Sequence, residues 1–295
     1  MKKLISAALG ITMILCFFSS CGAKDTDALG DILNSYKKHG LSSWWEAVAI
    51  YGAGENPAKY KGFKELRLSL EGQANLKMAS YVTVASIAAV CGEDIGDFDK
   101  YEEYKSSLKD FLENPIEGRS LNDYIFSCLA LKCSGTAFDE EPVLGYLIGA
   151  QKPDGGFSIS PGGESGDVDV TAFAVFALHL MCKGGESEPI SKAMDFLAGS
   201  MGSDGTFSSY GNENSNSTAC ALSAFIIRQN YAGGEAAAIG KASNGLSLFL
   251  AKGGGYSFLK DGEANQLATA QAAIALGDLK NNMSAWERLY RNFNS

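Results

Sequence analysis

Seven acidic side chains lie in or beside glycine-rich loops in the second half of the sequence, where they could do acid or electrostatic chemistry. They are Glu164, Asp167, Asp169, Asp204, Glu213, Asp261 and Glu263. Glycoside hydrolysis needs two carboxyl groups about 5–9.5 Å apart across a cleft. Spacing along the chain selects no such pair here. The alternative, which we favour, is that these acids are solvated and support turns and helix caps.

Asp169 is the candidate general acid, with Asp167 beside it at the start of an apolar run. A general acid needs a pKa tuned by burial and by its partners. The chain has two histidines, His39 and His179. Because His179 falls far along the same apolar run, we interpret it as a packed core residue. The structural alternative is that Asp169 caps a helix, as predicted also for Ser217 and Asn265, at about 1 kcal/mol each.

A further group of aromatic and polar residues is expected to bind a ligand near the same loops, since ligand sites are usually apolar concavities with a few polar groups. The candidates are Trp44, Trp45, Tyr81, Asp123, Glu164, Asp167, Asn214, Asn216, Glu263, Asn265 and Gln266. Trp44 and Trp45 are adjacent, so we expect one to enter the core and the other to contact the ligand. Phe157, Phe207 and Tyr256 are expected to fill the interfaces between repeats.

An internal repeat positions these candidates. Three segments align, at 154–178, 204–225 and 253–276. Each has a glycine-rich turn that closes on an aromatic residue, a polar loop, and a Thr-Ala step that opens an Ala-rich apolar run. The aromatic residues are 50 and 49 positions apart, which is typical of a stacked or closed array of repeats.

Similar apolar runs without the glycine turn occur at 44–54, 78–90 and 122–131, which makes about six repeats. Between them lie segments such as 101–112, whose apolar residues recur every three and four positions, as in a helix with one buried face. Amphipathic helices belong outside and all-round apolar helices inside. The sequence therefore predicts an all-α fold, an α/α toroid in one domain over 28–295. A solenoid is the alternative.

The repeats resemble the terpenoid-cyclase and protein-prenyltransferase superfamily, and more closely the bacterial surface proteins with prenyltransferase/squalene-oxidase repeats. The resemblance rests on the sequence QKPDGGF at 151–157, the Asp-rich loop after it and the Thr-Ala helix, and it is clearest over 151–276. It implies the toroid fold and a ligand-binding or catalytic centre at the loop end of the barrel.

The resemblance also implies two chemistries whose motifs are incomplete. Class II cyclases carry D-x-D-D, in which the middle Asp is the acid; Asp169 matches that position, but Val170 replaces the last Asp. Protein prenyltransferases bind zinc through Asp, Cys and His; Cys220 matches the Cys, but Ala268 stands at the His position. We therefore expect no metal and no cofactor, because a catalytic zinc site needs its third ligand.

The N-terminus resembles a bacterial lipoprotein signal. Two lysines precede an apolar run from 4 to 18, which is shorter than the roughly 20 residues that cross a bilayer. Ser19, Ser20 and Cys21 resemble the site at which a diacylglyceryl group is attached to the Cys. We expect a signal peptide at 1–20, a lipid anchor and tether at 21–27, and export to the outer face of the cytoplasmic membrane. Ordinary cleavage with an unmodified Cys21 is the alternative.

Composition limits the partners. The chain has 295 residues, of which 46% are hydrophobic, and a net charge of -9, which argues against nucleic acid because its binding relies on Lys and Arg. Five cysteines remain after Cys16 and Cys21, and without a CxxC motif we interpret them as small buried residues. The expected function is binding of a small molecule, glycan or envelope protein without catalysis. The alternatives are a cyclase-like enzyme that uses Asp169, an α/α-barrel hydrolase, or a scaffold.

Overall fold

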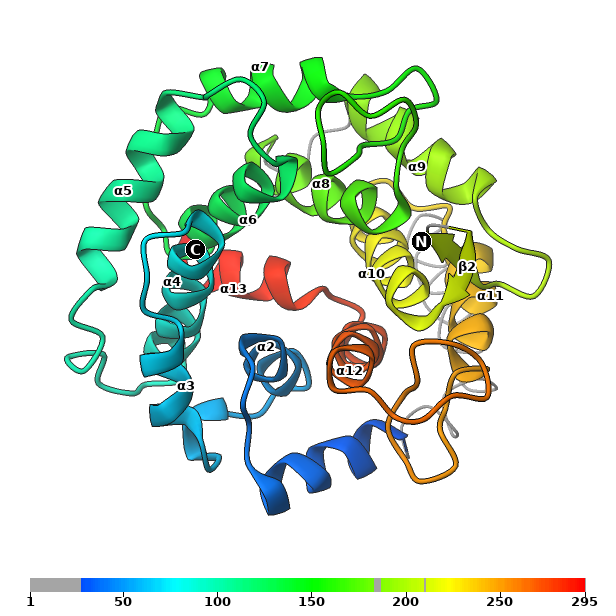
Figure 1. Cartoon of the computed structure of the whole chain (residues 1–295), viewed down its shortest axis with the longest axis horizontal. Coiled ribbons are helices and arrows are strands. Elements are labelled where there is room, and N and C mark those ends of the chain that lie inside the picture. The colour runs from blue at the N-terminus through cyan, green and yellow to red at the C-terminus, as the bar shows by residue number, and fades with distance from the viewer. Residues whose placement is uncertain (1–27, 183–186, 210, 295) are drawn as a thin grey trace, which may run out of the picture.

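An inner ring of six helices forms the centre of the protein, as the computed structural model shows over residues 28–182, 187–209 and 211–294 (Figure 1). The inner helices are α2 (Trp44–Gly52), α4 (Asn75–Val90), α6 (Leu121–Lys132), α8 (Val168–Met181), α10 (Ser215–Tyr231) and α12 (Gln266–Asn281). Each packs against the next, and α12 packs against α2. The ring is therefore closed, which confirms the predicted α/α toroid and rules out the open solenoid.

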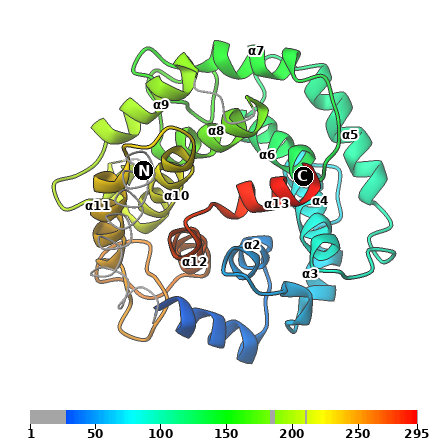
Figure 2. The same ribbon diagram turned by 180° about the vertical axis from the view of Figure 1, so that it is seen from behind.

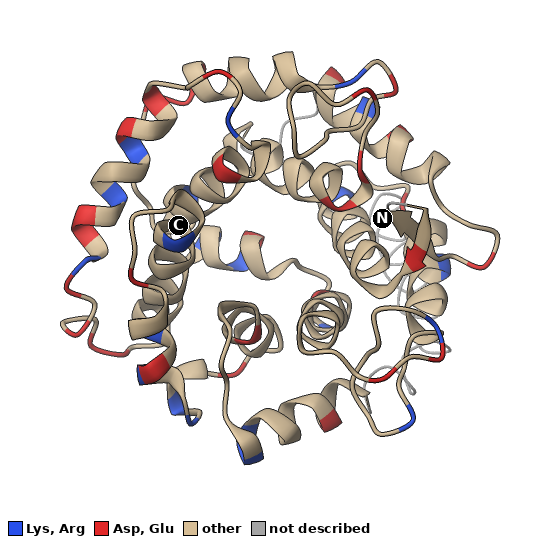
Figure 3. Ribbon diagram, viewed as in Figure 1, with Lys and Arg blue, Asp and Glu red and all other residues tan. Residues whose placement is uncertain are grey.

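An outer layer of amphipathic helices surrounds this ring and alternates with it along the chain. It consists of a helix over 28–39, α3 (Phe63–Ser69), α5 (Tyr101–Glu113), α7 (Glu141–Ala150), α9 (Glu188–Gly199) and α11 (Ala236–Ser247), with the short 3-10 helix η1 (Pro57–Lys59) before α3. In α5, Tyr101, Tyr104, Leu108 and Leu112 are buried, whereas its exposed face carries acidic and basic side chains (Figure 3). This is the pattern that the spacing of apolar residues predicted.

A threonine hydroxyl ties each of the last three loops to the inner helix that follows it. The hydroxyl accepts the backbone N–H of the aromatic residue that closes the glycine turn. The pairs are Phe157 with Thr171 at 2.8 Å, Phe207 with Thr218 at 3.0 Å, and Tyr256 with Thr269 at 2.9 Å. All three aromatic side chains are buried. They fill the interior between repeats, as expected from the sequence.

The glycines of these turns are required by close packing against the outer helices. Gly155 and Gly205 have φ values of +89° and +86°, a region that residues with a side chain rarely adopt. A Cβ at Gly155 would lie 2.4 Å from the carbonyl oxygen of Lys192, and one at Gly205 would lie 1.9 Å from that of Lys241. The repeated glycine turn therefore marks where a loop touches α9 or α11.

The helix caps correct part of the sequence prediction. Asn265 caps α12 by accepting the N–H of Ala268 at 3.0 Å, as predicted. Asp167 rather than Asp169 caps α8, and Asn214 rather than Ser217 caps α10. The reason is that the chain stays extended up to the cap. Asp167 pairs with Phe157 in an antiparallel bridge, and Asn214 pairs with Phe207 between β1 (Phe207–Ser209) and β2 (Asn212–Asn214).

A C-terminal helix, α13 (Ala285–Asn294), lies across the end of the ring at which the inner helices finish (Figure 2). Asp278 at the end of α12 accepts the N–H of Ala285 at 2.8 Å. Arg288 donates to the carbonyl of Tyr51 at 3.2 Å. The repeat pattern did not predict α13. We call it the floor of the barrel, and we call the opposite end, where the inner helices begin, the mouth.

The signal-peptide and lipid-anchor predictions, with Cys16 and Cys21, fall outside the described residues. Within the described ranges, no helix combines the length and the hydropathy that a bilayer span requires. The five cysteines there are free thiols, and Cys128, Cys133 and Cys220 are buried.

Replacing Thr218 with valine tests the threonine contact. The substitution keeps the shape of the side chain but leaves the buried N–H of Phe207 without its acceptor, which costs about 1–3 kcal/mol. Urea unfolding is expected to show a loss of this size, with partial recovery in Thr218→Ser. Thr83→Val is the matched control, because the Thr83 hydroxyl only donates to a carbonyl of its own helix, that of Ala79. Equal losses in Thr218→Val and Thr83→Val would contradict the assignment.

Candidate functional site

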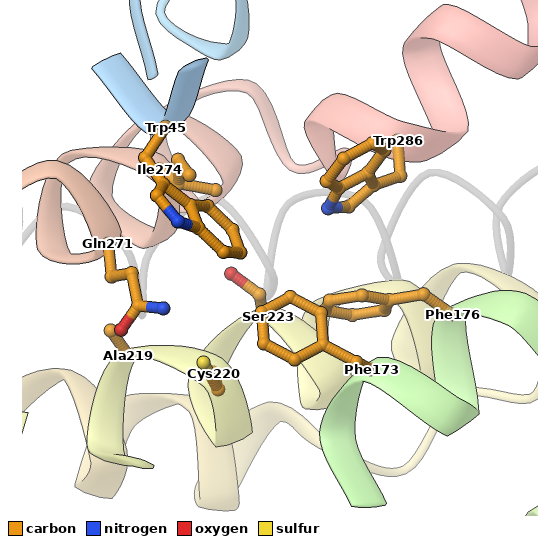
Figure 4. Close-up of a pocket in the computed structure, with 9 residues that line it drawn as sticks. All are labelled: Trp45, Phe173, Phe176, Ala219, Cys220, Ser223, Gln271, Ile274 and Trp286. Atoms are coloured by element: carbon orange, nitrogen blue, oxygen red, sulfur yellow. The ribbon is translucent and has the colours of Figure 1, made fainter. Parts of the chain in front are cut away.

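A small hollow lies inside the ring, between the mouth and the floor (Figure 4). We call it the central pocket. Its empty volume of about 250 Å³ includes open solvent. Its lining comes from α2, α8, α10, α12 and α13. The lining residues are Trp45, Phe173, Phe176, Ala219, Cys220, Ser223, Gln271, Ile274 and Trp286. Large rings from α2, α8 and α13 thus face small side chains from α10, and the difference in size leaves the space open.

The aromatic side of the central pocket is a continuous cluster. The rings of Trp44 and Trp45 lie 4.1 Å apart between centroids, and both pack against Phe126, at 5.6 and 5.7 Å. Trp45 also contacts Phe173 at 5.6 Å, and Trp44 contacts Trp286 at 6.1 Å. The prediction that only one of the two adjacent tryptophans faces inward is therefore wrong. Side chains about 100° apart on an inner helix both reach the interior of the ring.

The polar side of the central pocket is formed by Gln271, Ser223 and Cys220. The Gln271 side chain is 8% exposed, and its Oε1 makes no hydrogen bond to the described residues. Burial raises the pKa of the Cys220 thiol well above its usual range, and the charges of Asp169 and Asp167 add to the rise. A thiol held neutral in this way is a weak nucleophile.

A polar arc lies one helical turn above the pocket, toward the mouth. Asn122, Asp169 and Asn216 are each 47 residues apart and occupy the same position on α6, α8 and α10. Asp169 precedes Phe173 by four residues, so the two side chains share a helix face. The Oδ1 atoms of Asn122 and Asp169 are buried without a hydrogen-bond partner among the described residues. The arc therefore offers hydrogen-bond acceptors to anything that enters the pocket.

Burial raises the pKa of Asp169 to about 6; the Asp167 carboxylate adds to the rise, and the nearby Ser217 hydroxyl opposes it. Asp169 is therefore partly protonated near neutral pH. Asp123, in the first turn of α6, also has a pKa raised by burial, which the Arg119 charge opposes.

Another carboxyl group with a raised pKa, that of the fully buried Asp278, lies below the pocket and near the floor. It follows Ile274 by one turn on α12, and its Oδ2 has no hydrogen-bond partner among the described residues. Burial raises the pKa of Asp278 to about 7. Glu287 adds to this rise, whereas the side chain of Ser223, the N–H of Ala285 and Arg288 oppose it. Because Ser223 also lines the pocket, the floor carboxyl is linked to the pocket wall.

Three of the predicted ligand-binding residues cap inner helices and so stabilise the fold. Asp167 caps α8 and accepts a hydrogen bond from the Ser209 hydroxyl. Asn214, which is buried, caps α10, and Asn265 caps α12. Their side-chain oxygens are thus used by backbone N–H groups, which explains their types without a ligand.

Tyr81 does not line the mouth, which corrects its assignment as a ligand-binding candidate. Its side chain is fully buried, and its ring packs edge-on against Phe98 at 5.3 Å and Tyr104 at 5.1 Å. The Tyr81 hydroxyl lies 3.4 Å from the N–H of Lys100. Position 81 comes nearly two turns into α4 and faces the outer layer.

Gln266 joins the last inner helix to the first. Its Nε2 donates to the Ser42 hydroxyl at 2.6 Å and to Glu46 Oε1 at 3.1 Å. The buried Glu46 carboxylate also accepts the N–H groups of Ser42 and Ser43, at 2.6 and 3.1 Å. Gln266 therefore lies at the mouth, as predicted, but its contacts support ring closure.

The remaining acidic candidates lie outside the lining of the central pocket. Glu164 and Glu263 are exposed in their loops. Asp204 and Glu213 both bind the ammonium group of Lys260, at 2.8 and 2.6 Å. In the described part of the chain, no cluster of three or more His, Cys, Asp or Glu side chains is arranged to hold a metal ion.

Comparison with known proteins shows the fold alone. No protein-family model matches the chain, and no curated protein matches it. Among solved structures, the glycosyl hydrolase family 88 protein from Bacteroides vulgatus is similar over 91% of this chain and 99% of its own, with 11% identity and a TM-score of 0.62. Protein geranylgeranyltransferase-I of Candida albicans in complex with GGPP is similar over 60% of this chain and 56% of its own, with 15% identity and a TM-score of 0.48.

Sequence reasoning missed several residues of the site. Asn122 is spaced 47 residues from Asp169, so the repeat period could have found it. Gln271 and Phe173 are concealed within the apolar runs, where no sequence signal separates inward from lateral positions. Trp286 lies on α13, outside the repeats.

Replacing Asp278 with asparagine is expected to change the pH dependence of stability. The folded-state pKa of about 7 exceeds the value of about 3.9 for an unfolded Asp. The folded state therefore holds this proton more tightly, and the contribution of Asp278 to stability is lost as the pH rises from about 4 to about 7. The amide of the variant would not ionise and could still accept the N–H of Ala285.

Unfolding free energies of the wild type and of Asp278→Asn, measured by urea titration from pH 4 to pH 8, are expected to diverge. The variant gains relative stability on the order of 4 kcal/mol across this range. Parallel curves for the two proteins would show that Asp278 ionises in the folded protein as it does in water.

Proposed function

We propose that this protein binds a small ligand in the central pocket and carries out no reaction on it. The observation that supports the proposal is the unbonded Oε1 of Gln271, which is buried in a hollow otherwise lined by aromatic and small side chains. A buried acceptor without a partner costs about 1–3 kcal/mol. A ligand that donates to this oxygen would remove that cost.

The arrangement of acids supports binding more than catalysis. Val170, at the position of the third Asp of the cyclase motif, is buried and supplies no hydrogen bond to Asp169. Asp167 is occupied by the α8 cap and by Ser209. The two acids of the motif that remain therefore lack the network through which a cyclase acid would be held and resupplied with protons.

A second candidate function follows from Asp169 itself. A carboxyl group with a pKa near 6 at the entrance of a pocket is suited to general acid catalysis. An acid-catalysed reaction on an apolar substrate is therefore the alternative to simple binding.

We further propose that the protein is exported and anchored to the outer face of the cytoplasmic membrane through Cys21. The proposal rests on the apolar run from 4 to 18 and on the small residues before Cys21. The first described helix begins at residue 28. The barrel would then lie close to the membrane surface, where its mouth could take up a ligand or an envelope partner.

The binding proposal is tested by titrating the purified protein with a panel of sugars, amines and small apolar molecules while its melting temperature is measured. At least one compound is expected to raise it. Ala219→Leu, which fills the pocket, and Gln271→Leu, which removes the acceptor, should abolish that rise. Ala264→Leu, on an exposed loop, is the control. Failure of every compound, or formation of a product that disappears in Asp169→Asn, would contradict ligand binding without catalysis.

The anchor is tested by expressing the full chain in a bacterium supplied with labelled palmitate. The wild-type protein is expected to take up label and to sediment with membranes, whereas Cys21→Ser should do neither, because its hydroxyl cannot form the thioether. Cys182→Ser is the control. Label retained in Cys21→Ser would place the modification elsewhere, and an unlabelled wild type would refute lipidation.

A further inference from the structure

The interior of the central pocket is electron-rich. Four aromatic side chains line it, those of Trp45, Phe173, Phe176 and Trp286 (Figure 4). The face of an aromatic ring carries partial negative charge, and a cation within about 6 Å of the ring centroid is attracted to it. The attraction grows to about 2 kcal/mol or more where water is excluded, and here Trp286 is 2% exposed.

No basic side chain in the pocket wall offsets the partial negative charge of the ring faces. None of the nine lining residues is Lys, Arg or His. The Asp169 carboxyl lies about one helical turn above the pocket, and the Asp278 carboxyl lies about one turn below it, where Glu287 and Arg288 are its charged neighbours. Asp278 is fully buried and Asp169 is half-buried, and each has a buried oxygen atom without a hydrogen-bond partner among the described residues. A cation in the pocket would lie between two carboxyl groups.

The side-chain oxygens in and above the pocket that lack a hydrogen-bond partner among the described residues are all acceptors. Gln271 Oε1 in the pocket, and Asn122 Oδ1 and Asp169 Oδ1 in the polar arc, are acceptors that the described residues leave unbonded. An occupant that only accepts hydrogen bonds would satisfy none of them. An occupant that carries N–H or O–H groups can donate to these oxygens, and one that carries positive charge is attracted by their partial negative charge.

The helix N-termini at the mouth do not reverse this conclusion. Their dipoles favour anions, but the effect falls off within the first turn. Asp167, Asn214 and Asn265 already cap three of them. The pocket begins about a turn further in, at Phe173, Ala219 and Gln271.

We propose that the central pocket takes a small organic cation, an amine or a quaternary ammonium group, held against the rings of Trp45 and Trp286. The Gln271 oxygen and the Asp169 carboxyl attract its positive charge and accept from any N–H or O–H group that it carries. The inference rests on the proposed ligand-binding function. Part of the volume of about 250 Å³ is open solvent, so the enclosed part of the pocket admits only a small group. Phosphate-bearing ligands are disfavoured because no basic side chain lines the pocket.

The charge is tested with two probes of nearly equal shape, choline and its neutral isostere 3,3-dimethylbutan-1-ol. The chain has three tryptophans. They are Trp44, Trp45 and Trp286, which all belong to the pocket or its aromatic cluster, so tryptophan emission reports on this site. Choline is expected to change the emission saturably, and the neutral isostere should bind at least tenfold more weakly.

Two variants separate the contribution of the Trp45 ring to binding from that of the Asp169 charge. Trp45→Leu keeps an apolar side chain but removes the ring and is expected to weaken choline binding at least tenfold. Asp169→Asn keeps the size of the side chain, removes its charge, and should weaken choline binding without affecting the isostere. Glu117→Gln removes an exposed charge from the loop before α6 and should change neither. If Trp45→Leu does not fold, Asp169→Asn alone decides the matter.

The outcomes distinguish this inference from the function on which it rests. Equal binding of choline and the isostere would contradict the preference for a cation, and so would binding of other compounds in the pocket when choline does not bind. Either result would leave the proposed ligand binding intact. Failure of choline together with every compound of the wider panel would overturn both.

Discussion

The burial of helices that are apolar on all sides is the constraint on which the rest of the structure depends. In α8 every residue from Val170 to Met181 is buried, and such a helix is stable only with protein on each side of it. An outer helix covers one side, two inner neighbours cover the flanks, and the interior covers the last. The first and last inner helices can obtain both neighbours only if the ring closes. Gln266 donates to Glu46 where the last inner helix meets the first. The buried Glu46 carboxylate also accepts the N–H groups of Ser42 and Ser43, so its donors come from both ends of the ring.

Closure also determines what the interior can hold. Six inner helices leave a central space that side chains must largely fill, because an empty apolar volume loses dispersion contacts. Here Trp44, Trp45 and Phe126 fill it from one side, and α13 brings Trp286 up from the floor. The central pocket survives because α10 contributes Ala219, Cys220 and Ser223 opposite the rings. The site is therefore a consequence of unequal side-chain size around a closed ring, with α13 lying across one end of it.

Features that recur with the repeat could be predicted from the sequence, and features of single repeats could not. The glycine-turn repeat predicted the buried roles of Phe157 and Phe207, and the alternation of amphipathic and all-round apolar segments predicted the alternation of helices. The caps of α8 and α10 were placed two and three residues late, because the sequence does not show that a bridge keeps the chain extended up to Asp167 and Asn214. Tyr81 was misplaced since an all-round apolar helix gives no signal for which side faces inward. The floor helix has no counterpart in the repeats, so no repeated sequence pattern indicated that Trp286 would line the pocket.

The carboxyl groups of Asp169, which is half-buried, and Asp278, which is fully buried, bear on whether the central space is a site or only a packing defect. A barrel that served purely as a scaffold would gain stability from an apolar residue at position 169, since burial disfavours the charged form of that carboxyl group and raises its pKa. Burial also raises the pKa of Asp278, although that carboxyl group accepts the N–H of Ala285. Ionisable groups with perturbed pKa values cluster at functional sites, so such a group at a cleft is a candidate for a functional role. Structural ion pairs can also account for buried acids, but each of these two carboxyl groups keeps an oxygen that no described group bonds. A pocket flanked by two such oxygens, lined by aromatic rings and without a basic side chain, has the character of a receptor for positive charge.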